Sequence, residues 1–198
     1  MMESTAAVPG SARSSESASA QDSLLADVSK GLESLNRSVE AFVRPMESSL
    51  RHRPPPSGGW SVDSVLEHLC LAGELYLQAM TEALARSGAG RDRGHWRPTF
   101  AGRILAWSMV STWRLRAPNV VVPGPVPRLD VLDEFLRLNA SVDALLQSAT
   151  DREWRRLRFA SPLERRISLN FGDGSLIVLR HGERHYQQMA RVARSLAG

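Results

Sequence analysis

The sequence is poor in cysteine, in lysine and in long apolar runs. Its 198 residues include one cysteine, Cys70, which excludes an intramolecular disulfide framework and a zinc site built from several thiolates. A single cysteine also fits a reducing cytosol. The longest apolar stretch, residues 104–113, lies between Arg103 and Arg114 and is about half as long as a membrane span requires. We therefore predict a cytoplasmic protein with no transmembrane segment and no membrane partner.

Lysine is almost absent from the basic residues. Lys30 is the only lysine among 25 basic residues, so 24 are arginines, a bias that we attribute to genome composition. The net charge is only +4, and acidic residues alternate with the arginines through most of the chain. The one basic cluster, residues 86–116, contains no recognisable DNA-reading helix and no aromatic RNA-binding motif. We therefore predict no nucleic-acid partner.

Apolar residues are also scarce at the N-terminus. Residues 1–21 are small and polar, and they lack the basic and apolar regions of a secretory signal peptide. Because this stretch has too little apolar content to fold, we predict a disordered tail over residues 1–21. The chain as a whole is 42% hydrophobic, which is enough for one well-packed domain, predicted over residues 22–198.

Four segments carry apolar residues at the three- and four-residue spacing of an amphipathic helix. We predict helices over about residues 22–43, 61–80, 128–149 and 175–196, with Ser61 as the N-cap of the second. The sequence thus predicts an all-α four-helix bundle. Its long connection between the second and third helices argues against a simple up-down-up-down topology.

The long connection, residues 88–127, is rich in tryptophan. Glycines and prolines bracket one short amphipathic piece, which predicts a crossover with a single packed helix. We interpret Trp96, Trp107 and Trp113 as core and rim packing; the alternative is the wall or lid of a substrate pocket. Membrane-surface binding by this arginine-flanked segment is a further alternative.

A second irregular region precedes the last helix. Residues 155–159 and 166–171 partly alternate between apolar and polar side chains, which predicts extended pieces. Gly172, Asp173 and Gly174 follow them and are typical of a turn.

Two histidines lie four residues apart on the apolar face of the last predicted helix. His181 and His185 stand one above the other, with about 5–6 Å between their Cβ atoms, so both can reach one divalent ion. A third ligand is expected from a facing helix, and His68 is the only other histidine on a predicted inward face. His52 and His95 fall in irregular segments.

Three neutral imidazoles with an open fourth position are typical of a catalytic metal site. They suit zinc, nickel, copper or iron. Two alternatives stay open at this point: a solvated surface pair at His181 and His185, and a core network of histidines and carboxylates.

Several neighbours of the histidines have alternative interpretations. Cys70 lies about 200° around the helix from His68, and we predict a buried, inert thiol. Gln188 either orients His185 or contributes to packing. Tyr76 either lines the pocket or belongs to the core. We interpret Glu67 and Glu74 as charges exposed to solvent or placed at an interface.

Two motifs resemble those of the DinB-like (DinB/YfiT) superfamily. GGWSVDSVLEHL, residues 58–69, is similar to the W-S-x6-H-L start of that family's second helix. LRHGERHYQQMARV, residues 179–192, is similar to its final H-x3-H-x2-Q segment. The resemblance implies an up-down-down-up four-helix bundle, often dimeric, that holds one divalent metal ion through three histidines. Carried over by motif, these are His68, His181 and His185.

The resemblance also implies a class of activity. Members include transferases and isomerases that use a low-molecular-weight thiol, so we predict a transferase of this kind with zinc or nickel, a small-molecule substrate and a homodimeric assembly. The alternative is a non-catalytic metal-binding or stress-linked interaction module. The long crossover and residues 161–175 depart from the family pattern, and both should border the pocket. Arginines of the crossover are expected to hold an anionic cosubstrate.

Overall fold

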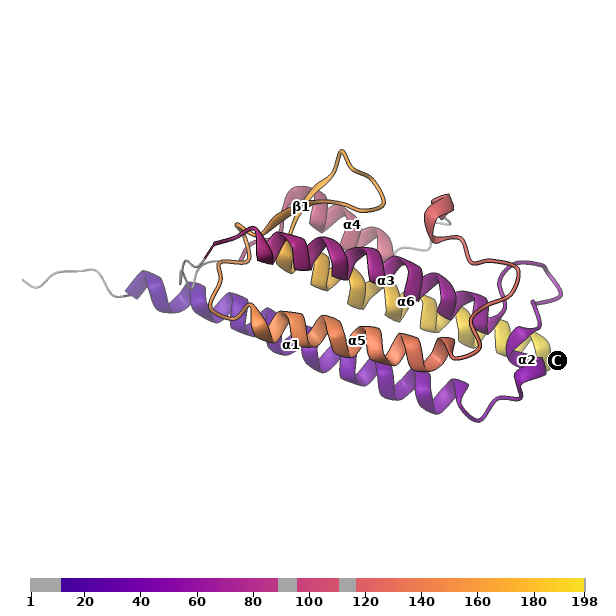
Figure 1. Ribbon diagram of the computed structural model, residues 1–198. Helices are drawn as coiled ribbons and strands as arrows, with labels where there is room; N and C mark the ends of the chain where they lie inside the picture. The colour runs from indigo at the N-terminus through magenta and orange to yellow at the C-terminus, as the bar shows by residue number, and fades with distance from the viewer. Residues whose placement is uncertain (1–11, 89–95, 111–116, 198) are drawn as a thin grey trace, which may run out of the picture.

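Four long helices form the body of the protein (Figure 1). The computed structural model describes residues 12–88, 96–110 and 117–197. Seen from the side, α1 and α6 run in one direction while α3 and α5 run in the other, which is the predicted up-down-down-up topology. The helices are α1 (Ala12–Val43), α3 (Val62–Ala85), α5 (Val131–Ser148) and α6 (Phe171–Ala197).

The bundle core lies between these helices. α3 packs against α5 and α6, and α1 packs against the same two helices, so α1 and α3 are diagonal to each other. Each helix contributes the apolar stripe that its spacing predicts. The core includes Val28, Leu32, Val39, Leu66, Met80, Phe135, Val142, Ile177 and Met189.

Shorter elements connect the long helices. The crossover between α3 and α5 contains one packed helix, as predicted, and this helix, α4, lies against α6. β1 and β2 form a small antiparallel pair in which Phe159 lies opposite Leu169, so both predicted extended pieces are confirmed. The short elements are α2 (Ser48–His52), α4 (Phe100–Val110), the 3-10 helix η1 (Asn119–Val121), β1 (Arg158–Ala160) and β2 (Ser168–Asn170).

The first helix begins ten residues earlier than the sequence predicts. α1 starts at Ala12, so the expectation of a disordered tail over residues 1–21 is corrected for residues 12–21; residues 1–11 lie outside the described part of the chain. At the end of this stretch, the side chain of Gln21 is buried. It accepts from the backbone N–H of Trp154 at 3.2 Å and donates to the carbonyl of Arg152 at 2.9 Å. This anchor is polar, so apolar content does not reveal it.

The last helix also begins early, and the predicted turn at residues 172–174 is wrong. These residues form the first turn of α6, where Asn170 Oδ1 accepts from the backbone N–H of Asp173 at 2.9 Å. Both glycines lie where another segment approaches closely. A Cβ atom on Gly172 would overlap with the indole nitrogen of Trp96, and one on Gly174 would lie 2.9 Å from the sulfur of Met80. The buried Asp173 accepts from the hydroxyl of Thr99 at 2.7 Å, which ties the crossover to the start of α6.

The crossover tryptophans have different environments. Trp96 packs against the core and donates to Asn170 Oδ1 at 3.1 Å, as the packing interpretation predicts. Trp107 is 64% exposed on α4, and Trp113 lies outside the described residues. No helix in the described ranges has the length and hydropathy that crossing a membrane would require.

Candidate metal centre

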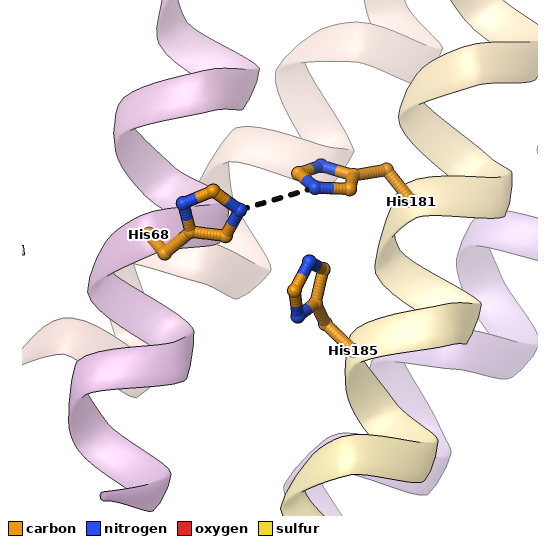
Figure 2. A group of neighbouring side chains, drawn as sticks. All are labelled: His68, His181 and His185. Atoms are coloured by element: carbon orange, nitrogen blue, oxygen red, sulfur yellow. Dashed lines mark hydrogen bonds between the residues drawn. The ribbon is translucent and has the colours of Figure 1, made fainter. Parts of the chain in front are cut away.

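Three histidines from two helices meet between α3 and α6. His68 of α3 faces His181 and His185 of α6, and Figure 2 shows all three rings directed toward one another. One nitrogen from each ring lies within 4.8 Å of the others, and the Nε2 atoms of His68 and His181 are 3.1 Å apart. Within the described ranges, no other group of histidine, cysteine, aspartate and glutamate side chains comes together in this way. The structure therefore brings together the three residues selected from the sequence.

The start of α3 determines how His68 is presented. Ser61 caps the helix by accepting from the backbone N–H of Ser64 at 3.1 Å, as the sequence predicts. His68 lies two turns later on the face that packs against α6. Trp60, just before the cap, covers its ring, with ring centroids 4.8 Å apart. Capping and packing thus hold this imidazole in place.

Hydrogen bonds determine the tautomers of two histidines. His68 Nδ1 lies 2.7 Å from the carbonyl oxygen of Val121, and because a carbonyl only accepts, this nitrogen carries the proton. His185 Nδ1 likewise donates to Gln188 Oε1 at 2.8 Å. Both rings therefore direct an unprotonated Nε2 toward the centre of the triad. Gln188 orients His185, which is the first of its two predicted roles.

The imidazoles are poorly hydrated. Burial lowers the pKa of His68 and His181 and lowers that of His185 to about 3. Repulsion from His68 when that ring is protonated, and from Arg184 and Arg191, adds to this effect at His185. The three rings are therefore neutral at pH 7, which is the state that a metal ligand requires.

The donor set fits a divalent ion of borderline softness. Two imidazole nitrogens bound to one tetrahedral zinc ion lie roughly 3.3 Å apart, close to the 3.1 Å between the Nε2 atoms of His68 and His181. No carboxylate in the described part of the chain hydrogen-bonds to the triad. The alternative of a core network of histidines and carboxylates is therefore wrong for these residues. Three neutral nitrogen donors suit a divalent transition-metal ion.

The triad lies in the wall of an open cleft of about 1930 Å³. The cleft extends over α6 and is bordered by the segment before α3, by α4, by residues 117–121 and by α1. It gives a small molecule access to the side of the triad. Side chains that share this cleft with the histidines include Trp60, Leu105, Val121, Arg184, Gln188 and Arg191.

Two other predicted residues belong to the core. Cys70 is buried, its sulfur lies 3.8 Å from the carbonyl oxygen of Val131, and burial raises its pKa to about 12. The prediction of an inert thiol is therefore confirmed. Tyr76 is buried as well, with its hydroxyl 3.5 Å from that of Ser161, so the core alternative holds.

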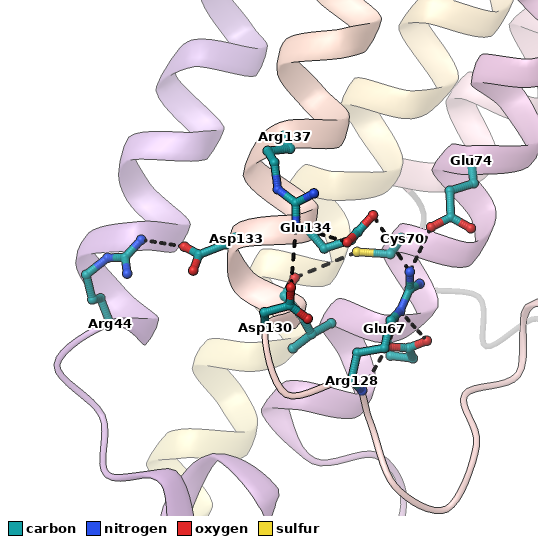
Figure 3. Close-up of polar contacts among 10 residues, drawn as sticks. Arg44, Glu67, Cys70, Glu74, Arg128, Asp130, Asp133, Glu134 and Arg137 are labelled. Atoms are coloured by element: carbon teal, nitrogen blue, oxygen red, sulfur yellow. Dashed lines mark hydrogen bonds and ion pairs between the residues drawn. The ribbon is translucent and has the colours of Figure 1, made fainter.

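Glu67 is not the solvent or interface charge that the sequence suggested. It is buried, and Arg128 Nε lies 3.0 Å from both of its carboxylate oxygens, while Arg128 Nη1 reaches Glu74 at 3.0 Å (Figure 3). Arg128 directly follows the crossover of residues 88–127, so these ion pairs attach the segment that follows Val121 to α3. Arg128 therefore has a structural role, and an anion held by crossover arginines stays a prediction.

The chain was compared with known proteins and families. The model of one family, described as the DinB superfamily, matches residues 32–189. This span contains all three histidines, the whole of the first motif and residues 179–189 of the second. No curated protein and no solved structure matches the chain significantly.

Proposed function

The chain belongs to the DinB superfamily, and on that premise we propose that His68, His181 and His185 bind one divalent metal ion, zinc or nickel. We further propose that the protein is a metal-dependent transferase that uses a low-molecular-weight thiol. The observation that carries the metal proposal is the pair of determined tautomers. Val121 and Gln188 each accept an Nδ1 proton, which leaves two buried Nε2 lone pairs aimed at one point.

A divalent ion with three imidazole ligands supplies Lewis acidity and lowers the pKa of a thiol that it coordinates. The chain's own part is to keep the ligands deprotonated and oriented. Burial keeps the imidazoles deprotonated. The hydrogen bonds from His68 to Val121 and from His185 to Gln188 orient the two rings. Trp60 covers His68 and limits the contact of its ring with water.

The open cleft favours an enzyme over the alternative of a non-catalytic metal-binding or interaction module. A structural metal site is closed by its ligands and their surroundings, whereas these histidines share their cleft with side chains that a small molecule can reach. A small-molecule substrate, a homodimeric assembly and a cytoplasmic location stay predictions from the sequence.

The first test is elemental analysis of the full chain, purified without a histidine tag and then reconstituted with zinc or nickel. We expect about one equivalent of metal per chain. Less than a tenth of an equivalent after reconstitution would contradict the metal site.

The thiol proposal has its own test. Cysteine, as a simple thiol probe, is titrated into protein loaded with cobalt(II), which replaces zinc and absorbs visible light. We expect a new sulfur-to-metal charge-transfer band. An unchanged spectrum from fully loaded protein would contradict thiol use while leaving the metal site intact.

Gln188→Leu is expected to weaken metal binding about 10- to 100-fold, because His185 loses the acceptor that holds its tautomer and ring orientation. Gln187→Leu is the matched control, since Gln187 lies in the same cleft without bonding to a triad histidine. The affinities are measured by competition with a chromophoric chelator. Equal affinities in the two variants would mean that Gln188 only contributes to packing.

A further inference from the structure

The crossover helix α4 presents apolar side chains to solvent as well as to the core. On its inner face, which packs against α6, Leu105 joins the core. On its outer face, Phe100, Ile104 and Trp107 are spaced by four and three residues and are 78%, 49% and 64% exposed. A helix that is apolar on both faces is normally buried, so the outer face of α4 lacks a partner within the described part of the chain.

Arginines without ion-pair partners lie beside this outer face. Arg97, just before α4, and Arg103, within it, are exposed. The loop between β1 and β2 carries the exposed Arg165 and Arg166, and because β2 contacts α4, this loop lies on the same side of the bundle (Figure 1). Among the described residues, none of the four forms an ion pair. Glu164 is the one acidic residue of the loop, and α4 has none. The surface is therefore both apolar and positively charged.

We propose that this α4 surface binds the anionic face of a lipid membrane. It consists of Phe100, Ile104, Trp107, Arg97, Arg103, Arg165 and Arg166. Aromatic side chains, tryptophan above all, settle between the headgroups and the acyl chains, and an anionic leaflet attracts nearby basic side chains. This binding is the membrane-surface alternative that the sequence left open, and it takes the place of the prediction of no membrane partner.

Charge disfavours the other occupants of this surface. In a symmetric dimer the α4 surfaces of two copies would face each other, so the unpaired arginines of one copy would meet those of the other. Nucleic acid matches the positive charge, but its phosphate backbone gives the exposed apolar side chains no apolar contact. A bilayer with anionic lipids satisfies both properties of the surface.

Flotation of the full chain with lipid vesicles tests the proposal. Vesicles of phosphatidylcholine alone are compared with vesicles in which half of the lipid is phosphatidylglycerol, at low and at high ionic strength. We expect binding to the anionic vesicles that weakens at least tenfold at high ionic strength, and little binding to the neutral vesicles. No binding to the anionic vesicles, or equal binding to both compositions, would overturn the proposal.

The Phe100→Ser/Trp107→Ser double variant should bind the anionic vesicles at least tenfold more weakly, because two apolar side chains no longer enter the interface. Both side chains are exposed and neither lines the histidine cleft, so the fold and the metal content should not change. Val126→Ser/Leu129→Ser is the matched control, since these side chains are 78% and 91% exposed just before α5, which packs against α1 and α3. Equal vesicle affinity in the two double variants would contradict a role of α4.

The arginines are tested separately. Arg97→Gln/Arg103→Gln should also bind the anionic vesicles at least tenfold more weakly. Arg37→Gln/Arg194→Gln removes the same net charge from exposed positions on α1 and α6 and should keep wild-type binding. The same loss in both double variants would mean that net charge alone attracts the protein, and the α4 surface would be wrong.

Tryptophan fluorescence locates the contact. Trp107 passes from water into the lipid interface on binding, so the emission of the wild-type protein should shift to shorter wavelength with anionic vesicles. Trp107→Phe keeps an apolar ring and should keep most of the binding while it loses this shift. An unchanged shift in Trp107→Phe would mean that another tryptophan enters the lipid, which would overturn the placement at α4.

The same variants separate a membrane from the other occupants. Binding of duplex DNA is measured by fluorescence anisotropy, and the oligomeric state is measured by gel filtration. If Phe100→Ser/Trp107→Ser weakened DNA binding or changed the oligomeric state while vesicle binding stayed the same, the surface would belong to nucleic acid or to a second copy of the chain. Either result would overturn the proposal.

Discussion

His68→Ala and His185→Ala are each expected to lose stoichiometric metal binding. Changes to the partners that orient a ligand typically cost 10- to 100-fold in affinity, so removal of a ligand should cost more than about 100-fold. His68 is buried on α3 and His185 is buried on α6, and among the described residues no further histidine, cysteine, aspartate or glutamate joins this group to replace either ring. Metal content after gel filtration and affinity by chelator competition both measure the loss.

His52→Ala is the matched control for this prediction. It also removes one histidine, but His52 lies on α2 with its Nδ1 2.7 Å from the carbonyl of Ser48, away from the triad. This variant should keep one equivalent of metal. His68→Phe keeps a ring in the buried position, which separates loss of a ligand from loss of packing. Retention of stoichiometric metal by a folded His68→Phe variant would contradict the site.

Trp154→Ala is expected to lower the free energy of unfolding by about 3–5 kcal/mol. Trp154 is completely buried, its indole nitrogen donates to the carbonyl of Ala149 at 2.9 Å, and its ring packs on Phe171 with centroids 5.3 Å apart. Truncation leaves a cavity next to Phe171, the first residue of α6, and removes one of the two N–H donors to the Ala149 carbonyl. Urea unfolding of the metal-free protein, followed by circular dichroism, measures the change.

Trp107→Ala gives the comparison for this prediction. Trp107 is 64% exposed on α4, so its removal should change the free energy of unfolding by less than about 1 kcal/mol. Similar losses in the two variants would contradict the buried position of Trp154. The difference in the free energy of unfolding between the two variants measures how much more the buried tryptophan contributes to stability than the exposed one.

The helices could be predicted because their signals are local. Apolar spacing identifies the inward face of each helix, and Ser61 marks the start of α3 through a contact three residues away. The two helix starts that were wrong lie near contacts that apolar spacing does not reveal. Gln21 is held by Trp154, and the first turn of α6 fits against Trp96 of the crossover. Neither contact leaves a periodic pattern in the sequence.

Part of the candidate site was predictable for the same reason. The spacing of His181 and His185 places both on one helix face, and their position on the apolar stripe indicates that they point inward. His68 was predicted as the third ligand because it lies on the inward face of its helix and matches the family motif. Glu67, its neighbour, was misjudged because its partner Arg128 lies 61 residues away.

The sequence by itself determined the four helices, their inward faces and the three histidines, because these depend on periodicity within a helix and on two short motifs. Only the tertiary structure decided how the site is completed. The acceptor of the His68 proton is a carbonyl 53 residues away, and the cleft combines α1, α4 and α6. Such contacts follow from how separate segments pack against one another, which spacing within a single helix does not reveal.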